Sequence, residues 1–336
     1  MNNLGFIVFV MGGVGKRAGI QFMKMLRNLG LHEKVVVVYL DTDGGDLNDK
    51  EVREYFDIVV DLSLSPGQIE TVRENAGCFG PAVEFVVRKY GAQLVNEYEA
   101  QAGSRTIRML TLLSFAYYLP AILDVIHKAS CMLMGRGLTR FIKPVMISSS
   151  GGGCGSAVQV LLAYCFGQKK LKRQIRYGLP SHIHSPITAV LAEPFTLARL
   201  HKPPHRDRIL SNSAATTIET ESLDAALKPY EVIYHLAFTN SSGVILSSVQ
   251  DLDRVLGNAI LQILICTDVV ASRRADTFAI GKQLDRYQGL DSHRFGLEFG
   301  MSHEFVDRNL FTRDLDNPFT GEPVADEQKG GDSDEI

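Results

Sequence analysis

The chain passes from a strand pattern to a helix pattern at the stretch Ser149-Ser150-Gly151-Gly152-Gly153-Cys154-Gly155-Ser156-Ala157. The apolar run Val145–Ser148 precedes this stretch, and a helical pattern follows it over Ala157–Phe166. Consecutive glycines leave the backbone amides unobstructed by Cβ atoms, so that several amides can surround the oxygens of a phosphate group. We therefore interpret the stretch as a phosphate-binding loop at the start of a helix. A flexible turn without a ligand is the alternative interpretation.

A second glycine loop stands near the start of the sequence. It spans Gly12–Gly19, follows the apolar run Gly5–Val10 and opens a helix predicted over about Arg17–Leu29. Unpaired amides and the helix dipole at such a start favour an anion. The candidate phosphate ligands in this loop are Gly12, Gly13, Gly15, Lys16 and Arg17.

Other loop types share part of this pattern. The spacing Gly13-x-Gly15-x-x-Ala18, with Asp41 at the end of the next strand, also fits the fingerprint of a dinucleotide-binding enzyme. A Walker-type P-loop is excluded, because Arg17 stands where a magnesium-binding Ser or Thr belongs and Val10 stands where the leading glycine belongs. Glycines that only turn the chain tightly are a third interpretation.

Alternating strand and helix patterns predict an α/β protein with a parallel sheet. The expected strands are Gly5–Val10, Val35–Leu40, Val145–Ser148, Ile187–Ala192 and Val232–Phe238. In open α/β sheets, ligands bind beyond the carboxyl ends of the strands. We therefore expect the glycine loops to open onto one edge of the sheet, which is the candidate site.

The composition is that of a soluble globular protein. The 336 residues include 35 Lys and Arg against 38 Asp and Glu, a net charge of −3, and 45% hydrophobic residues. This balance provides no basic field, so no nucleic-acid partner is expected. The apolar run Leu110–Leu123 is interrupted by Pro120 and is shorter than the roughly 20 residues of a membrane span, which predicts a buried helix and no integral membrane contact. Five cysteines without a C-x-x-C pair, and a start without a signal-peptide pattern, predict a cytoplasmic protein.

The stretch Gly151–Ser156 resembles the GGGTG[ST]G signature of the tubulin/FtsZ superfamily, with Cys154 in place of the threonine and Ala157 in place of the last glycine. Other stretches resemble loops of this family in the same order along the chain, from about Leu4 to Ile280. They are Gly12–Gly19 for the first nucleotide loop, Asp41-Thr42-Asp43 for the loop after the second strand, Ala102-Gly103-Ser104-Arg105 for the AGxN loop that senses the γ-phosphate, and Ala192-Glu193-Pro194-Phe195 for the T-x-P-F stretch.

The resemblance implies a Rossmann-like GTPase domain of the tubulin/FtsZ type, with GTP or GDP bound and Mg²⁺ as a candidate cofactor. Asn240 would lie at the sugar or base, and Asp253 would lie where an Asn or Asp reads guanine. A carboxylate suits that role, because it can accept hydrogen bonds from the guanine ring N–H and from the exocyclic amine. A solvent-facing or capping role for Asp253 is the alternative. Lys16 and Arg105 would add positive charge near the phosphates.

In this family an acidic loop, N-x-D-x-x-D, completes the nucleotide site of the neighbouring subunit. The matching stretch here, Arg274-Ala275-Asp276-Thr277-Phe278-Ala279, keeps one acid as Asp276 and has Ala279 in place of the other. Asp276 is therefore the candidate catalytic residue, as a general base or metal partner, and Asp268 is a rival. Slow or absent hydrolysis is expected.

Four histidines invite a zinc hypothesis, but no cysteine or carboxylate nearby completes a ligand set, so no metal site is predicted. These histidines are His182, His184, His201 and His205.

The resemblance also divides the chain. A nucleotide-binding domain is expected over residues 1–248, with a helical insertion at about 61–101, and a central helix over 249–272. A reduced C-terminal subdomain over 273–321 would replace the second domain of the family, and residues 322–336 are expected to form an acidic disordered tail.

The resemblance therefore implies a GTP-binding protein that assembles head to tail with its own copies, and heterologous contacts of this kind that do not close produce filaments. Two alternatives are a non-polymerising scaffold or regulator, which would bind a protein partner through the insertion or the acidic tail, and an NAD-dependent Rossmann oxidoreductase. The latter predicts that NAD binds and that Gly151–Ser156 can be altered without loss.

Overall fold

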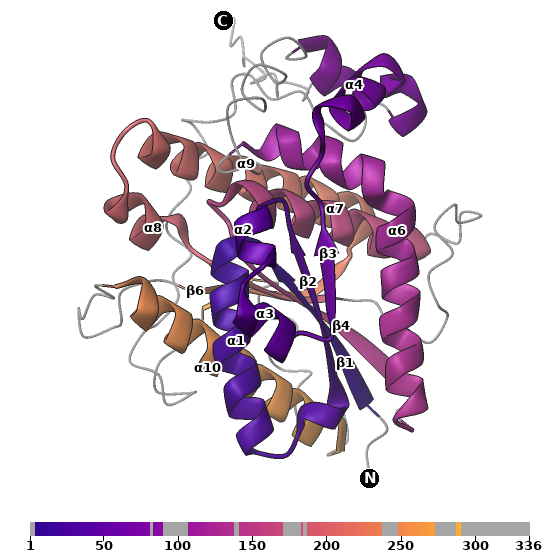
Figure 1. The fold of residues 1–336 in the computed structure, drawn as a ribbon. Coiled ribbons are helices and arrows are strands. Elements are labelled where there is room, and N and C mark those ends of the chain that lie inside the picture. The colour runs from indigo at the N-terminus through magenta and orange to yellow at the C-terminus, as the bar shows by residue number, and fades with distance from the viewer. Residues whose placement is uncertain are drawn as a thin grey trace, which may run out of the picture.

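The computed structural model describes residues 4–80, 83–89, 107–137, 141–170, 183, 187–236, 248–272 and 287–289. Over these residues the chain forms a seven-stranded sheet in the order β3-β2-β1-β4-β5-β6-β7, with helices on both faces (Figure 1). The strands are β1 (Leu4–Met11), β2 (Val35–Asp41), β3 (Ile58–Asp61), β4 (Phe141–Ser149), β5 (Ile187–Ala192), β6 (Tyr230–Leu236) and β7 (Tyr287–Gly289). Each neighbouring pair is parallel. The predicted α/β class with a parallel, Rossmann-like sheet is therefore confirmed.

Helices alternate with the strands along the chain. They are α1 (Gly12–Asn28), η1 (His32–Lys34), α2 (Gly44–Leu47), α3 (Lys50–Tyr55), α4 (Pro66–Glu74), η2 (Ala76–Phe79), α6 (Arg108–Gly135), α7 (Gly153–Lys170), α8 (Pro194–Leu200), α9 (His205–Leu227) and α10 (Val249–Ser272), together with helical residues 83–89. A helix begins inside each glycine stretch, earlier than the sequence predicted: α1 begins at Gly12 rather than Arg17, and α7 begins at Gly153 rather than Ala157.

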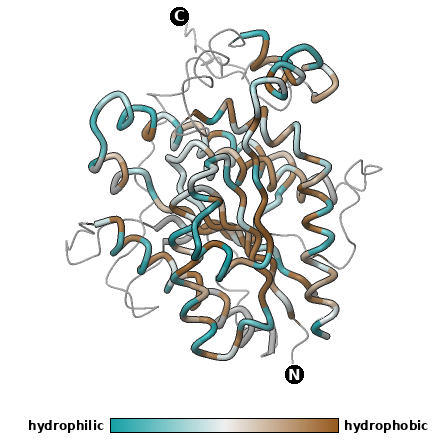
Figure 2. The backbone as a smooth tube through the Cα atoms, viewed as in Figure 1, coloured by the Kyte–Doolittle hydropathy of each residue, from teal (hydrophilic) through white to brown (hydrophobic). Residues whose placement is uncertain are grey.

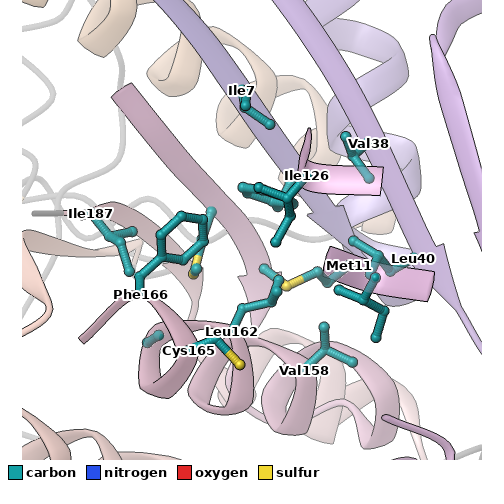
Figure 3. Close-up of a cluster of buried hydrophobic side chains, with 14 of the residues drawn as sticks. Ile7, Met11, Val38, Leu40, Ile126, Val158, Leu162, Cys165, Phe166 and Ile187 are labelled. Atoms are coloured by element: carbon teal, nitrogen blue, oxygen red, sulfur yellow. The ribbon is translucent and has the colours of Figure 1, made fainter. Parts of the chain in front are cut away.

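The central strands are buried on both faces, which explains their continuous apolar sequence. Figure 2 shows hydrophobic residues concentrated along these strands. In β1, alternate side chains enter two separate cores. Phe6, Val8 and Val10 pack into the core beneath α1 and α10, while Ile7, Phe9 and Met11 pack into the core beneath α6 and α7. Figure 3 shows part of the second core, where Phe166 and Leu162 of α7 face Met11 of β1 and Ile126 of α6.

The short edge strand β3, which the sequence analysis did not anticipate, ends at Asp61, where the helical insertion predicted at about 61–101 begins, and α4 lies within that insertion. Ser65 starts α4 with a capping box: its hydroxyl accepts from the Gln68 amide, and the Gln68 side chain accepts from the Ser65 amide. Pro66 lies in the first turn of α4, where a backbone N–H would have no hydrogen-bond acceptor within the helix. This segment packs through a third hydrophobic cluster against the start of α6.

Among the described residues one helix, α6, is long and apolar enough to cross a membrane by length and composition alone, a criterion that core helices of soluble proteins also meet. In this structure its buried residues, such as Phe115, Ile122 and Ile126, pack into the second and third clusters. The run Leu110–Leu123 therefore lies in a helix packed against the sheet, as predicted. Apart from β7, residues 273–336, and with them the expected C-terminal subdomain and tail, lie outside the described residues.

Candidate functional site

The strand order reverses between β1 and β4, and both glycine loops lie at the carboxyl ends of these two strands. This is the position at which open α/β sheets form their ligand crevice. Met11, which precedes α1, makes no side-chain capping bond, and neither α1 nor α7 has an acidic residue in its first turn. The N-termini of α1 and α7 therefore lie at the same edge of the sheet. No acidic residue in either first turn compensates their orphan backbone amides or the positive ends of their helix dipoles.

Several of the candidate glycines are required by packing. Gly12 has a φ of +70°, and a Cβ on it would lie 3.0 Å from the Gly155 nitrogen. A Cβ on Gly155 would lie 2.7 Å from the Met11 carbonyl oxygen, and one on Gly15 would lie 2.9 Å from the Ile147 carbonyl oxygen. The two loops thus approach each other so closely that larger residues would clash.

Gly152 differs from these glycines, because no atom lies within 4 Å of the position of a Cβ on it, and its φ is not positive. Its neighbour Gly151 packs against Ile209 of α9, where a Cβ would lie 2.6 Å from the Ile209 Cγ2 atom. Packing therefore explains Gly151 and leaves Gly152 without a structural reason to be glycine. An open, Cβ-free backbone at a helix start is what a phosphate group would need.

Helix α9 holds the loop before α7 in place. Asn212 Nδ2 donates to the Gly151 carbonyl oxygen over 3.1 Å, and Thr216 Oγ1 donates to the Ser150 carbonyl oxygen over 3.1 Å. The Ser150 and Ser213 hydroxyls lie 2.9 Å apart. Sequence analysis missed these α9 residues, since they belong to no motif and lie about 60 positions downstream.

The two cations of the first loop, Lys16 and Arg17, have partners within the chain. Lys16 Nζ lies 2.6 Å from Asp46 Oδ1 and 3.1 Å from Asp49 Oδ2, and the lysine is only 8% exposed. Burial lowers the pKa of Lys16, but the two carboxylates outweigh it and raise this pKa above its usual value. The pKa of Asp49 is lowered by its hydrogen bond from the Glu51 amide and then by Lys16. Much of the Lys16 charge is therefore balanced internally.

Arg17 connects the first loop to α10. Its Nε donates to Asp253 Oδ2 over 2.8 Å, and its Nη1 lies 3.6 Å from the position of a Cβ on Gly13. The Asp253 side chain is 7% exposed, and burial raises its pKa although Arg17 lowers it. Its Oδ1 atom is buried and has no hydrogen-bond partner among the described residues. Asp253 therefore keeps one acceptor that a ligand N–H could use.

The side chain of Asp41 points into the protein interior. Its carboxylate accepts from the Tyr39 hydroxyl over 2.6 Å and from the amides of Thr42 and Asp43 over 2.7 and 3.3 Å. Burial raises the pKa of Asp41 to about 6, although these hydrogen bonds lower it. The Cys154 thiol is also buried, and burial followed by the charge of Asp41 raises its pKa well above the usual range. Cys154 is therefore a small protonated lining residue at neutral pH.

Glu193 follows β5 and precedes α8, whose first residue is Pro194. The glutamate is 6% exposed, and its Oε2 atom is buried without a hydrogen-bond partner in the described parts of the chain. Burial raises the pKa of Glu193 to about 7. Its carboxyl group is therefore close to half protonated near neutral pH.

Arg108, at the first position of α6, is a site residue that sequence analysis missed. Its Nε donates to Ser156 Oγ over 3.0 Å, and its guanidinium pairs with Glu219 of α9. No motif marks either residue. The predicted site residues Ala102–Arg105, Asn240 and Asp276 lie outside the described residues, so their roles stay predictions.

The residues present fit a phosphate-bearing ligand, because two helix N-termini converge beside the open backbone of Gly152. Within the described ranges, no group of three or more His, Cys, Asp or Glu side chains could hold a metal ion.

No model of a known protein family matches the sequence, and no curated protein matches it. Solved structures do resemble the fold. CetZ2 from Haloferax volcanii, in a GTPgS-bound protofilament, is 13% identical with a TM-score of 0.46, and the match covers 82% of this chain and 62% of CetZ2. CetZ from Methanosaeta thermophila is 14% identical with a TM-score of 0.49, over 86% of this chain and 60% of CetZ. The GDP-bound phage tubulin PhuZ is 13% identical with a TM-score of 0.43, over 80% of this chain and 57% of PhuZ.

At these identities the likeness is one of fold. The chain spans less than two thirds of the length of each of these three proteins.

Proposed function

We propose that this chain is a divergent, cytoplasmic member of the tubulin/FtsZ superfamily that binds GTP and GDP where the two glycine loops meet. The observation that carries the proposal is the open backbone of Gly152 beside two helix N-termini that have no acidic residue in their first turns. The order of the family-like loops along the sequence supports a tubulin-type ligand.

The amides at the starts of α1 and α7 would hold the phosphate oxygens, and the helix dipoles would balance part of the negative charge. Arg17 would add a cation at the edge of this cradle, oriented by Asp253. By resemblance, the loop Ala102–Arg105 would contact the terminal phosphate. Mg²⁺, bound chiefly to the phosphates, would neutralise charge and orient the terminal phosphate.

The free oxygen of Asp253 supports a preference for guanine. It is a buried acceptor without a partner among the described residues, and guanine offers N–H donors where adenine offers an acceptor. Glu193 and Asn240 would line the sugar side of the site by resemblance. NAD binding is disfavoured, because the Asp41 carboxylate accepts three hydrogen bonds from its own strand and loop and is 3% exposed.

Hydrolysis would be slow or absent. By resemblance, Asp276 would act on the nucleotide of a neighbouring copy, with Ala279 in place of the second acid. Head-to-tail contacts of this kind extend into filaments. An Asp276→Ala variant should then lose any turnover while it keeps its affinity for GTP.

The first experiment is a titration of the purified full chain with GTP, ATP and NAD in the presence of magnesium, with light scattering followed in the same sample. Selective GTP binding with rising scatter supports the whole proposal. GTP binding without scatter supports the non-polymerising alternative, NAD binding supports the oxidoreductase, and no binding at all refutes a nucleotide role.

A variant at Gly152 tests the location. Gly152→Asp places a carboxylate in open space directly before α7, where it can cap the helix, so we expect a melting temperature no lower than that of the wild type and GTP binding weakened at least tenfold by charge repulsion. Gly67→Asp is the matched control, because Gly67 is also in open space but lies in the first turn of α4. Equal GTP affinity in the two variants would show that the ligand binds elsewhere.

A further inference from the structure

Arg108 links three helices at the edge of the phosphate cradle. Its side chain is 12% exposed. Nε donates to the Ser156 hydroxyl over 3.0 Å, Nη2 donates to the Ser156 carbonyl over 3.3 Å, and Nη1 donates to Glu219 Oε1 over 3.0 Å. Nη2 also donates to Glu219 Oε2. The guanidinium is therefore fixed from two sides, by α7 and by α9.

These bonds determine the direction of the Ser156 hydroxyl. Arginine can only donate hydrogen bonds, so the Ser156 oxygen must accept from Arg108. The single hydroxyl proton is then available for another acceptor, and Ser156 Oγ donates it to the Gly152 carbonyl oxygen. A directed chain of hydrogen bonds thus runs from Arg108 through Ser156 to Gly152.

The Gly152 carbonyl belongs to the same peptide unit as the Gly153 N–H. In a planar trans peptide these two groups point in opposite directions. With the carbonyl held on the Ser156 side, the Gly153 N–H points away from Ser156, out of the start of α7. It is one of the orphan amides of the helix, so it is available to an anion.

Glycines on both sides of this peptide permit it to rotate, because neither carries a Cβ. A rotated peptide would present its carbonyl oxygen to the ligand in place of the N–H, and a carbonyl repels phosphate. The Gly152 oxygen is also the acceptor of the first backbone hydrogen bond of α7, because it directly precedes the first helical residue, Gly153. The Ser156 hydroxyl, directed by Arg108, is a second donor to the same oxygen and holds this orientation more firmly.

We propose that Arg108 is a positioning residue that holds the Gly152–Gly153 peptide, through Ser156, with its N–H facing the phosphates of the bound nucleotide. This inference rests on the proposed nucleotide-binding function. Arg108 does not itself touch the nucleotide. Glu219 neutralises the partly buried guanidinium and orients its fork toward α7.

The other end of α6 offers a matched control. Arg136, directly after α6, donates to the Val35 carbonyl over 2.7 Å and to Asp57 over 3.2 Å, and its side chain is 25% exposed. It fastens the opposite end of the same helix, and its described hydrogen bonds go to β2 and to Asp57 rather than to either glycine loop. Arg136→Met should therefore lower the melting temperature without changing nucleotide affinity.

The test variant is Arg108→Met combined with Glu219→Gln, which avoids leaving an unpaired carboxylate between the helices. GTP and GMP affinities are measured by titration calorimetry for this variant, the wild type and the Arg136→Met control, and melting temperatures are recorded for all three. We expect GTP binding to weaken by roughly ten- to a hundredfold, the effect of one amide bond to a charged group. GMP binding should change less, so that the GMP-to-GTP ratio of dissociation constants falls.

A second readout isolates the path through Ser156. If Arg108 acts through this hydroxyl, adding Arg108→Met and Glu219→Gln to the Ser156→Ala variant should weaken GTP binding no further than Ser156→Ala alone does. Additive losses would overturn the inference, as would an equal loss of GTP and GMP affinity or an unchanged GTP affinity. A wild-type chain that does not bind GTP would instead refute the proposed function, together with this inference.

Discussion

Replacing Glu193 should change the dependence of folding stability on pH. Burial raises the pKa of this carboxyl from 4.5 to about 7, and the side chain is only 6% exposed. Below pH 4.5 the folded and unfolded states both hold the proton. Between pH 4.5 and about 7 the unfolded state releases it first, so the free energy of unfolding falls as the pH rises. Above about pH 7 the carboxyl group is ionised in both states, and the full cost of burying its charge lowers the free energy of unfolding.

The size of the penalty follows from the shift. Each pKa unit corresponds to about 1.4 kcal/mol, so a shift of about 2.5 units gives roughly 3 kcal/mol. Glu193→Gln keeps the shape of the side chain and removes the titration. We expect the variant to match the wild type at pH 4 and to be more stable by roughly 3 kcal/mol at pH 8.

The assay is urea unfolding at intervals from pH 4 to pH 8.5, followed by circular dichroism, without nucleotide. Glu74→Gln on α4 is the control, since that side chain is exposed and its loss should leave the profile unchanged. A stability difference between Glu193→Gln and wild type that stays constant across the pH range would refute this reasoning. So would a difference that grows toward acid.

Four further substitutions separate the roles of individual site residues. Gly155→Ala should destabilise the fold by about 1–3 kcal/mol in thermal unfolding, because its Cβ would lie 2.7 Å from a carbonyl oxygen, whereas Gly152→Ala should change the unfolding free energy little. Asp253→Asn should reduce the preference for GTP over ITP, which lacks the exocyclic amine, by about tenfold in competition binding; an unchanged preference would exclude Asp253 from base recognition. Lys16→Met should lower stability by about 1 kcal/mol at pH 7. Because the pKa of Asp49 is lowered, that loss should persist to a pH below the usual pKa of an aspartate and disappear once Asp49 is protonated, and a loss that does not depend on pH would contradict the ion pairs.

The sequence predicted the sheet well because parallel strands that are buried on both faces consist of continuous runs of apolar residues. The predicted strand Ile187–Ala192 has the bounds of β5, and the predicted strands at Gly5–Val10 and Val35–Leu40 lie within β1 and β2. The edge strand β3 was missed, since its four residues are too short a run to give a clear strand pattern. Glycine was interpreted as a loop former, which placed the helix starts too late.

The candidate site was predictable only where a motif marks the backbone. Both glycine loops carry such a signal, and the structure brings them together at β1 and β4. The partners that orient them do not, because Arg108 and Glu219 lie 111 positions apart and meet only through the packing of α6, α7 and α9. The Lys16 ion pairs were missed for the same reason. A sequence shows which groups can form ion pairs, and the fold determines which of them meet.

The glycines of the site do not all argue for a ligand. Gly12, Gly15 and Gly155 lack side chains because two backbones approach within van der Waals contact, and a protein without any ligand would need them equally. Replacing these residues costs folding free energy, so a loss of binding in such variants would be ambiguous. Gly152 has no such packing reason, and a side chain there costs the fold little. Binding and folding can therefore be separated at this one position, and the phosphate hypothesis depends on what a side chain at Gly152 does to the ligand alone.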